Sequence, residues 1–71
     1  MRVVVKIKLK EILTERNMTQ SQLAKLSNLS ETVISIFVRG QGNSINKEYL
    51  SKIASALNIK DIGELLELEV I

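Results

Sequence analysis

Apolar residues recur at helical spacing in the middle of the chain, in two short segments separated by only three residues. Thr19 can cap the first segment, and the side chain of Gln22 can bond back to the Thr19 backbone. Ser30 can cap the second, and Gly40 follows it, where a left-handed residue commonly ends a helix. Asn28 is the candidate left-handed residue between them. The pattern predicts a helix-turn-helix.

The second of these helices has one apolar and one mainly polar face. With Ile34 pointing inward and a rotation of about 100° per residue, Phe37 and Val38 also point inward. The same rotation directs a second set of side chains outward: Thr32, Ser35, Ile36 and Arg39. The remaining apolar residues of the crook between the two helices are Leu23, Ala24 and Leu29. We expect the outward face to be the surface that contacts a partner.

Three more helices are predicted around this unit. The first runs from about Lys8 to Arg16 and stops at Asn17. The fourth starts at the Asn46 cap, with Ile45 and Leu50 as its apolar clamp, and ends at Asn58. Its inward face consists of Leu50, Ile53, Ala54 and Leu57. A short fifth helix is predicted from the pair Asp61 and Glu64, and it would carry Ile62, Leu65 and Leu66. The segment Gly40 to Ser44 has the composition of a loop.

Both ends of the chain alternate between apolar and charged residues, which is typical of strands. We expect strands at about residues 2–7 and 67–71, paired antiparallel. Pairing should bury Val3, Val5, Leu68 and Val70 against helices and place Arg2 or Lys6 opposite Glu67 or Glu69. Val4 and Ile71 would remain on the outer face, and a lone ribbon has open edges. A dimer seam at the ribbon would solve both problems.

Composition limits the function more than it defines it. The chain has 71 residues and a formal net charge of +2, enough for one domain, residues 1–71, with a thin core. It has no cysteine and no histidine, so disulfides and the usual zinc ligands are excluded. No acid, base, nucleophile or phosphate-loop arrangement is present, so we expect no enzyme activity, metal or cofactor. Lysines interrupt the N-terminal apolar residues, which predicts a cytoplasmic protein without a membrane span.

The central residues resemble the Cro and phage-repressor (XRE-like) family of helix-turn-helix regulators. The match runs through Met18-Thr19-Gln20, Leu23-Ala24, Asn28-Leu29-Ser30, Ile34-Ser35 and Arg39-Gly40. The resemblance implies an all-α, five-helix, lambda-repressor-like DNA-binding domain, here with a small terminal ribbon and with the helix-turn-helix at residues 19–39. It also implies that Gln20 and the start of the first of the two helices touch phosphate, and that Glu31, Thr32, Ser35 and Ile36 face base edges.

Two departures from the family pattern stand out. Position 36 is often a long polar or basic residue in similar sequences, whereas Ile36 leaves Arg39 as the only positive charge on the outward face. Many relatives also pair an Arg of the first helix with a Glu near the end of the recognition helix, and Leu13 and Val38 stand at these positions. Because both members are replaced, no charge is left unpaired. We interpret this second departure as repacking.

Two functional hypotheses follow. In the first, a homodimer binds an inverted-repeat operator in double-stranded DNA and regulates transcription by covering a promoter, with activation equally open. Phosphates would be held by Thr19, Gln20, Arg39, Asn43, Ser44 and Lys47, and bases would be faced by Glu31, Thr32, Ser35 and Ile36, the last against a thymine methyl. In the second, the scaffold is a protein-interaction module that uses the apolar surface of Val33 and Ile36.

Overall fold

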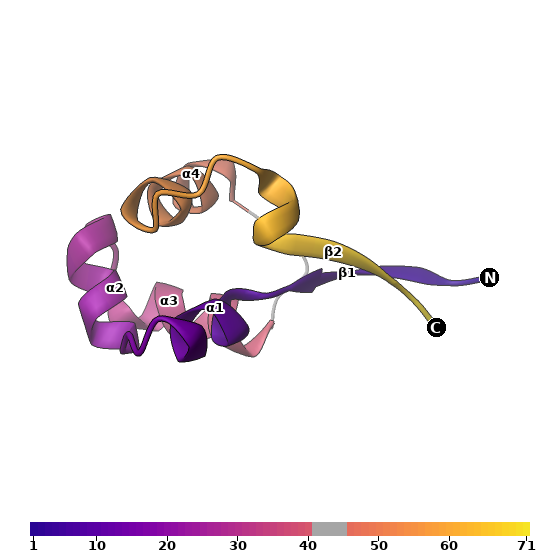
Figure 1. Cartoon of the computed structure of the whole chain (residues 1–71), viewed down its shortest axis with the longest axis horizontal. Coiled ribbons are helices and arrows are strands. Elements are labelled where there is room, and N and C mark those ends of the chain that lie inside the picture. Colours follow the sequence, from indigo (N-terminus) through magenta and orange to yellow (C-terminus); the bar gives the residue numbers. More distant parts are fainter. Residues whose placement is uncertain (41–45) are drawn as a thin grey trace.

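Four α-helices and a two-stranded ribbon make up the part of the chain that the computed structural model describes, residues 1–40 and 46–71 (Figure 1). The elements in chain order are β1 (Val3–Ile7), α1 (Leu9–Glu15), α2 (Gln20–Ser27), α3 (Glu31–Arg39), α4 (Lys47–Ala56), the 3₁₀ turn η1 (Ile62–Glu64) and β2 (Leu66–Val70). The predicted loop residues Asn43 and Ser44 and the clamp residue Ile45 lie outside the described residues.

Three of the predicted helix starts are confirmed by side-chain caps. Thr19 and Gln22 form a complete capping box at α2, and the Ser30 hydroxyl accepts a hydrogen bond from Val33 N at α3. The Asn46 side chain accepts from two backbone N–H groups of the first turn of α4. Each of these bonds satisfies a donor that the helix itself leaves unpaired. Local sequence therefore sets where these three helices begin.

The helix stops are equally local. Asn17, Asn28 and Asn58 have positive φ angles of 53°, 58° and 56°, and Gly40 has a φ of 66°. Asparagine and glycine tolerate this left-handed conformation better than other residues, and a helix cannot continue through it. These positions correspond to the predicted ends of α1, α2, α4 and α3.

The fifth α-helix that the sequence predicts is not formed. Asp61 does act as a cap, because its carboxylate accepts a hydrogen bond from Gly63 N at 2.9 Å. The segment that follows is only the three-residue turn η1, after which Leu66 enters β2. The pairing of Leu66 with Ile7 in the ribbon removes the residues that a second helical turn would need. Strand pairing therefore prevails over the local capping signal.

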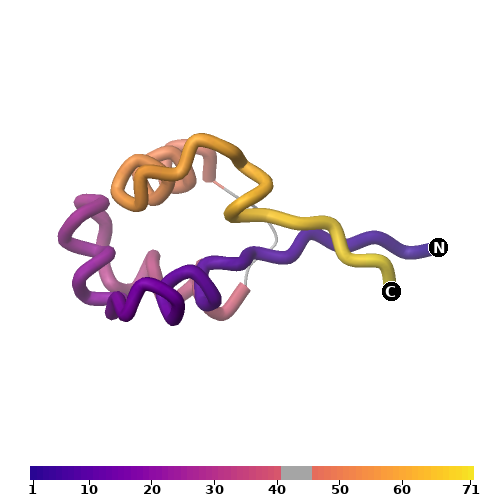
Figure 2. Tube along the Cα trace, viewed as in Figure 1, coloured from indigo at the N-terminus to yellow at the C-terminus, as the bar shows by residue number. Residues whose placement is uncertain are grey.

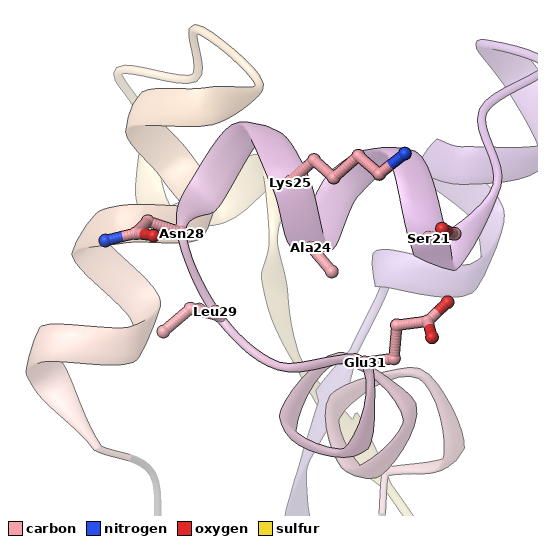
Figure 3. A pocket seen from close by; sticks show the side chains of 6 residues that line it. All are labelled: Ser21, Ala24, Lys25, Asn28, Leu29 and Glu31. Carbon is pink, nitrogen blue, oxygen red and sulfur yellow. The ribbon is translucent and has the colours of Figure 1, made fainter.

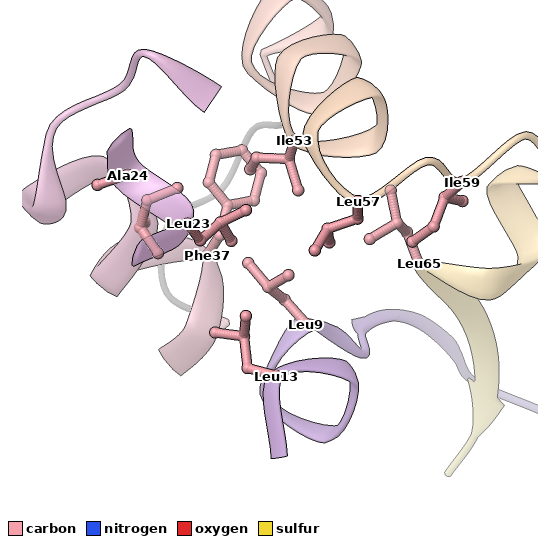
Figure 4. Close-up of a cluster of buried hydrophobic side chains, with 10 residues drawn as sticks. Leu9, Leu13, Leu23, Ala24, Phe37, Ile53, Leu57, Ile59 and Leu65 are labelled. Carbon is pink, nitrogen blue, oxygen red and sulfur yellow. The ribbon is translucent and has the colours of Figure 1, made fainter. Parts of the chain in front are cut away.

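All four helices contribute to the hydrophobic core, together with the segments that follow α4 and η1. Ten apolar residues form it: Leu9, Leu13, Leu23, Ala24, Ile34, Phe37, Ile53, Leu57, Ile59 and Leu65 (Figure 4). The Phe37 ring meets the ring of Tyr49 edge to face, with centroids 6.5 Å apart, and this contact joins α3 to α4. The guanidinium of Arg16 donates a hydrogen bond to Leu57 O at 2.6 Å and ties the end of α1 to the end of α4. The predicted inward face of α3 is confirmed.

The ribbon extends away from the helices along the longest axis of the molecule (Figures 1 and 2). Its strands pair antiparallel as predicted, and Lys6 lies opposite Glu67 with an Nζ to Oε1 distance of 3.9 Å. The predicted burial of its apolar side chains is wrong. The exposed fractions are 45% for Val3, 55% for Val5, 71% for Leu68 and 63% for Val70. The helices reach only as far as Ile7 and Leu66, so within residues 1–40 and 46–71 no layer covers the outer part of the ribbon.

Candidate nucleic-acid interface

The α2–α3 unit is held by buried contacts close to its turn. Ala24, which is 6% exposed, lies where the two helices approach, and Leu29 N donates to Ala24 O at 3.0 Å. Ser27 is also buried, and its hydroxyl donates to Leu23 O at 2.7 Å within α2. The small side chain of Ala24 allows α2 and α3 to come close, and the internally bonded Ser27 hydroxyl leaves no unpaired polar group on the side of α2 that faces α4. The angle between α2 and α3 is thereby fixed by packing.

The outward face of α3 is accessible. Glu31, Thr32, Ile36 and Arg39 are exposed, with Ile36 at 45%, and Ser35 is half-buried. An α-helix with its side chains is about 10–12 Å in diameter. This diameter matches the width of about 12 Å of the major groove of B-DNA, which admits an α-helix. The helical rotation predicted this face for Thr32, Ser35, Ile36 and Arg39, and Glu31 was added to it only by the family resemblance.

Arg39 and Ser35 are joined on this face. The guanidinium Nη2 of Arg39 donates a hydrogen bond to the hydroxyl of Ser35 at 2.7 Å, one helical turn earlier. The sequence prediction assigned these two residues to separate tasks, phosphate for Arg39 and bases for Ser35. The bond means that the position of the Arg39 charge depends on Ser35.

The apolar surface expected from Val33 and Ile36 is smaller than the alternative hypothesis requires. Val33 is partly buried and packs against the core, so only Ile36 presents an exposed aliphatic side chain on α3. A single exposed aliphatic residue is ordinary for a protein surface. The observed packing therefore gives the protein-interaction hypothesis no apolar patch on α3.

The start of α2 presents unpaired backbone donors. The Thr19 hydroxyl accepts from Gln22 N at 3.0 Å, and Thr19 N donates to the Gln22 side chain at 2.8 Å. Within the described residues, the N–H groups of Gln20 and Ser21 have no such partner. Free N–H groups and the positive end of the helix dipole favour an anion such as phosphate.

The remaining predicted phosphate contacts lie at the ends of other helices. Arg39 is the last residue of α3, and Lys47 is the exposed first residue of α4, directly after the Asn46 cap. Asn43 and Ser44, which the sequence assigned to phosphate, belong to the segment outside the described residues. The structure thus places the described members of the set at the starts of α2 and α4 and the end of α3.

The sequence prediction did not include Ser21 or Lys25 among the interface residues. Both line a shallow hollow between α2 and the start of α3, together with Ala24, Asn28, Leu29 and Glu31 (Figure 3). Lys25 is exposed, and neither ion pair found among the described residues involves it. The spacing of four residues between Ser21 and Lys25 places both on one side of α2, and this spacing was the available signal.

Comparison with known families agrees with this geometry. The family model of the Cro/C1-type HTH DNA-binding domain matches residues 8–70 of the 71-residue chain. The chain belongs to this family. No curated protein and no solved structure matches the chain significantly. The resemblance found in the sequence is therefore confirmed, and the protein is a DNA-binding regulator of the Cro/C1 type.

The apolar pair in place of the family's Arg and Glu is well accommodated in this Cro/C1-type domain. Leu13 is 6% exposed and belongs to the core, and Val38 is half-buried and packs against it. Two aliphatic side chains at these positions need no hydrogen-bond partner, whereas a lone charge there would carry a desolvation cost. The packing agrees with the interpretation of these positions as repacked.

Residues 1–40 and 46–71 lack the features of two other kinds of site. No helix there has the length and apolar character needed to cross a membrane. The same residues contain no group of three or more acidic, histidine or cysteine side chains placed to hold a metal ion.

Proposed function

We propose that this Cro/C1-type domain is a sequence-specific transcriptional repressor that acts as a homodimer on an inverted-repeat operator. The observation that supports it most is the outward face of α3, which combines polar side chains with one aliphatic residue on a rigid, well-capped helix. Such a face suits the major groove, where hydrogen-bonding groups and thymine methyls identify the base pairs. Covering a promoter requires only binding, so no catalytic group is needed.

In this proposal, the ends of the helices hold the DNA backbone and the middle of α3 reads sequence. Thr19 and Gln20 at the start of α2 bind one phosphate through hydroxyl, amide and backbone donors. Arg39 and Lys47 supply positive charge to further phosphates, with Asn43 and Ser44 between them in sequence. The base-facing side chains are Glu31, Thr32, Ser35 and Ile36. A carboxylate at Glu31 can accept from a cytosine amino group, and Ile36 can contact a thymine methyl.

A second recognition helix is needed because a single one reads too few base pairs to define a site. A symmetric dimer places two α3 helices in successive major grooves on the same side of the duplex, about 34 Å apart. The preferred operator should then be an inverted repeat with half-sites about 10 base pairs apart, centre to centre. Selection from random duplexes would identify this sequence and its spacing directly.

A salt titration tests the DNA-binding proposal. The chain should bind a fluorescent random duplex at low salt and more weakly at moderate salt, because backbone contacts release counterions. Arg39→Ala should weaken specific and random duplexes nearly alike. It should also reduce the magnitude of the log-affinity against log-salt slope by about 0.9 per contact, roughly two units for a dimer.

The matched control is Lys60→Ala, which removes one exposed charge near η1, away from α3 in sequence. It should leave the slope unchanged. If Arg39→Ala changes base preference without altering the slope, Arg39 is a base reader. If neither random nor selected duplexes bind the wild-type chain, the proposed function is wrong.

A further inference from the structure

The apolar face of the ribbon continues the hydrophobic core out of the helical body. Side chains alternate between the two faces of a strand, so the cross-strand pairs of this face are Val3–Val70, Val5–Leu68 and Ile7–Leu66. The inner pair, Ile7 and Leu66, packs against the core. The outer two pairs lie beyond the helices, as the projecting ribbon in Figure 1 shows. One apolar strip therefore begins inside the protein and ends in solvent.

Exposed apolar side chains are concentrated on this ribbon. Nine large hydrophobic residues are exposed among the described residues, and six of them belong to the ribbon and its ends. Four of the six share one face of the ribbon: Val3, Val5, Leu68 and Val70. Scattered exposed aliphatic residues are normal, but a contiguous group marks an interaction surface. A two-stranded ribbon is also only marginally stable without a covering layer.

We propose that the same face of a second copy of the chain covers the outer pairs, so that two ribbons stack face to face and form the homodimer seam. The seam consists of Val3, Val5, Leu68 and Val70 from each copy. The inference rests on the homodimer of the proposed function and names the surface that makes it. Stacked sheets pack about 10 Å apart with interdigitated side chains, and the charged faces of both ribbons stay in water.

The charges of the ribbon disfavour a two-fold dimer built through its edges. β1 carries Lys6, and Arg2 directly precedes this strand, whereas β2 carries Glu67 and Glu69. An antiparallel pair of β1 strands from two copies would bring basic side chains together, and a pair of β2 strands would bring acidic ones together. Like charges on adjacent strands are destabilising. Both symmetric edge contacts are therefore opposed by electrostatic repulsion.

The remaining edge contact, β1 of one copy with β2 of another, is attractive but does not close. Such a head-to-tail contact leaves a free β1 and a free β2 at the two ends, so further copies can add without limit. Face-to-face stacking is isologous and saturates at two copies, because each ribbon has only one apolar face. It is the arrangement that buries the apolar strip and ends in a dimer.

The small area of the apolar face of the ribbon limits the expected affinity of the dimer. A fully exposed Val or Leu side chain offers roughly 60–120 Å² of apolar surface, so four partly exposed ones offer about 150–300 Å² per copy. This is well below the typical value of about 800 Å² per partner in stable complexes. We therefore expect a dissociation constant in the micromolar range in free solution, with an operator carrying both half-sites favouring the dimer.

The test compares two substitutions of nearly equal exposure on opposite faces. Leu68→Lys places a charge on the proposed seam, and Ile71→Lys places one on the other face; these residues are 71% and 70% exposed. Sedimentation equilibrium of the full chain from about 1 to 100 µM should show a dimer for the wild type. Leu68→Lys should weaken dimerisation at least tenfold, and Ile71→Lys less than about threefold. Val70→Lys, farther along the seam, should repeat the Leu68→Lys result if circular dichroism shows native helix content.

Lys6→Gln separates face stacking from edge pairing. A face-to-face dimer should be unchanged by it, whereas a dimer through paired β1 edges should tighten because a repulsive charge is lost. Tightening, or open-ended oligomers that dissociate with salt, would overturn the proposal. A dimer that survives both Leu68→Lys and Val70→Lys would also overturn it while leaving the homodimer of the proposed function intact. Loss of DNA binding in a chain that still dimerises through the ribbon would instead refute the function and not the seam.

Discussion

The helical body and the terminal ribbon are built from similar aliphatic residues, yet they bury them to very different extents. Leu23, Ile34 and Ile53 in the body are 0% exposed, whereas Val5 and Leu68 in the ribbon are 55% and 71% exposed. Both regions have sequence patterns with a clear apolar side. The difference is that each apolar face in the body meets faces from other helices, while the ribbon face meets the body only at its inner end.

This contrast shows that an apolar periodicity defines a face and not its partner. A helix in a small bundle is surrounded by neighbours, so its apolar side is buried in nearly any compact arrangement. A ribbon formed by the two chain ends can point away from the bundle, and in this protein it does (Figure 2). The body thus owes its stability to internal contacts, and the ribbon is left with an exposed apolar face.

The largest expected effect is in the body. Phe37 is 8% exposed and contacts the Tyr49 ring, so Phe37→Ala should lower the free energy of unfolding by about 3–5 kcal/mol. This would unfold much of so small a domain. Val5→Ala in the ribbon is the matched comparison and should cost less than about 1 kcal/mol at concentrations where the chain is monomeric. Urea denaturation of both variants measures the difference, and equal costs would contradict the contrast between body and ribbon.

Substitutions on the outward face of α3 should have a smaller effect. They should change DNA recognition without changing the free energy of unfolding or dimerisation. Thr32→Ala should leave random-duplex binding almost intact and cost about 1–3 kcal/mol on the preferred operator. Ser35→Ala should cost a similar amount on the preferred operator, and it should also weaken random-duplex binding slightly, because Arg39 loses the Ser35 hydroxyl that holds it. Fluorescence titrations should show that the double variant Ser35→Ala/Arg39→Ala loses less binding free energy than the sum of the losses of its two single variants. Unchanged DNA binding in all of them would show that α3 is not the reading element.

Removing β2 should weaken dimerisation and leave recognition of a half-site intact, whereas the α3 substitutions should do the reverse. Deletion of residues 67–71 takes away nearly all of β2 and with it the proposed seam. We expect at least tenfold weaker binding to an inverted repeat, about 1.4 kcal/mol, with little change on a single half-site. Deletion of Ile71 alone, which lies outside β2, is the control. A truncated monomer that binds the inverted repeat as tightly as the full chain would separate the ribbon from DNA binding.

The smallest effect is expected at the start of α4, where the stabilising contacts are local. The Asn46 side chain accepts hydrogen bonds from Glu48 N at 2.8 Å and Tyr49 N at 3.2 Å. Asn46→Ala should lower the free energy of unfolding by about 1 kcal/mol, and Asn46→Ser should restore most of it. Thermal denaturation gives both values. A loss as large as that of Phe37→Ala would mean that Asn46 has a tertiary role beyond the cap.

Sequence alone was sufficient wherever the interaction is local. The caps at Thr19, Ser30 and Asn46 and the left-handed stop at Asn28 depend on groups within a few residues, so their signals are complete in the sequence. The inward position of Phe37 follows from helical geometry in the same way. The outward face of α3 was predictable because every member lies on one helix.

Tertiary structure decided the features that depend on where elements meet. The capping signal of Asp61 is genuine, but pairing of Leu66 with Ile7 shortens the expected fifth helix to a 3₁₀ turn. The Arg39–Ser35 bond depends on side-chain rotamers, which residue spacing permits but does not impose. Whether Val5 and Leu68 are covered depends on the direction of the ribbon relative to the helices. That direction is set by the packing of the whole body, and no local pattern of residues contains it.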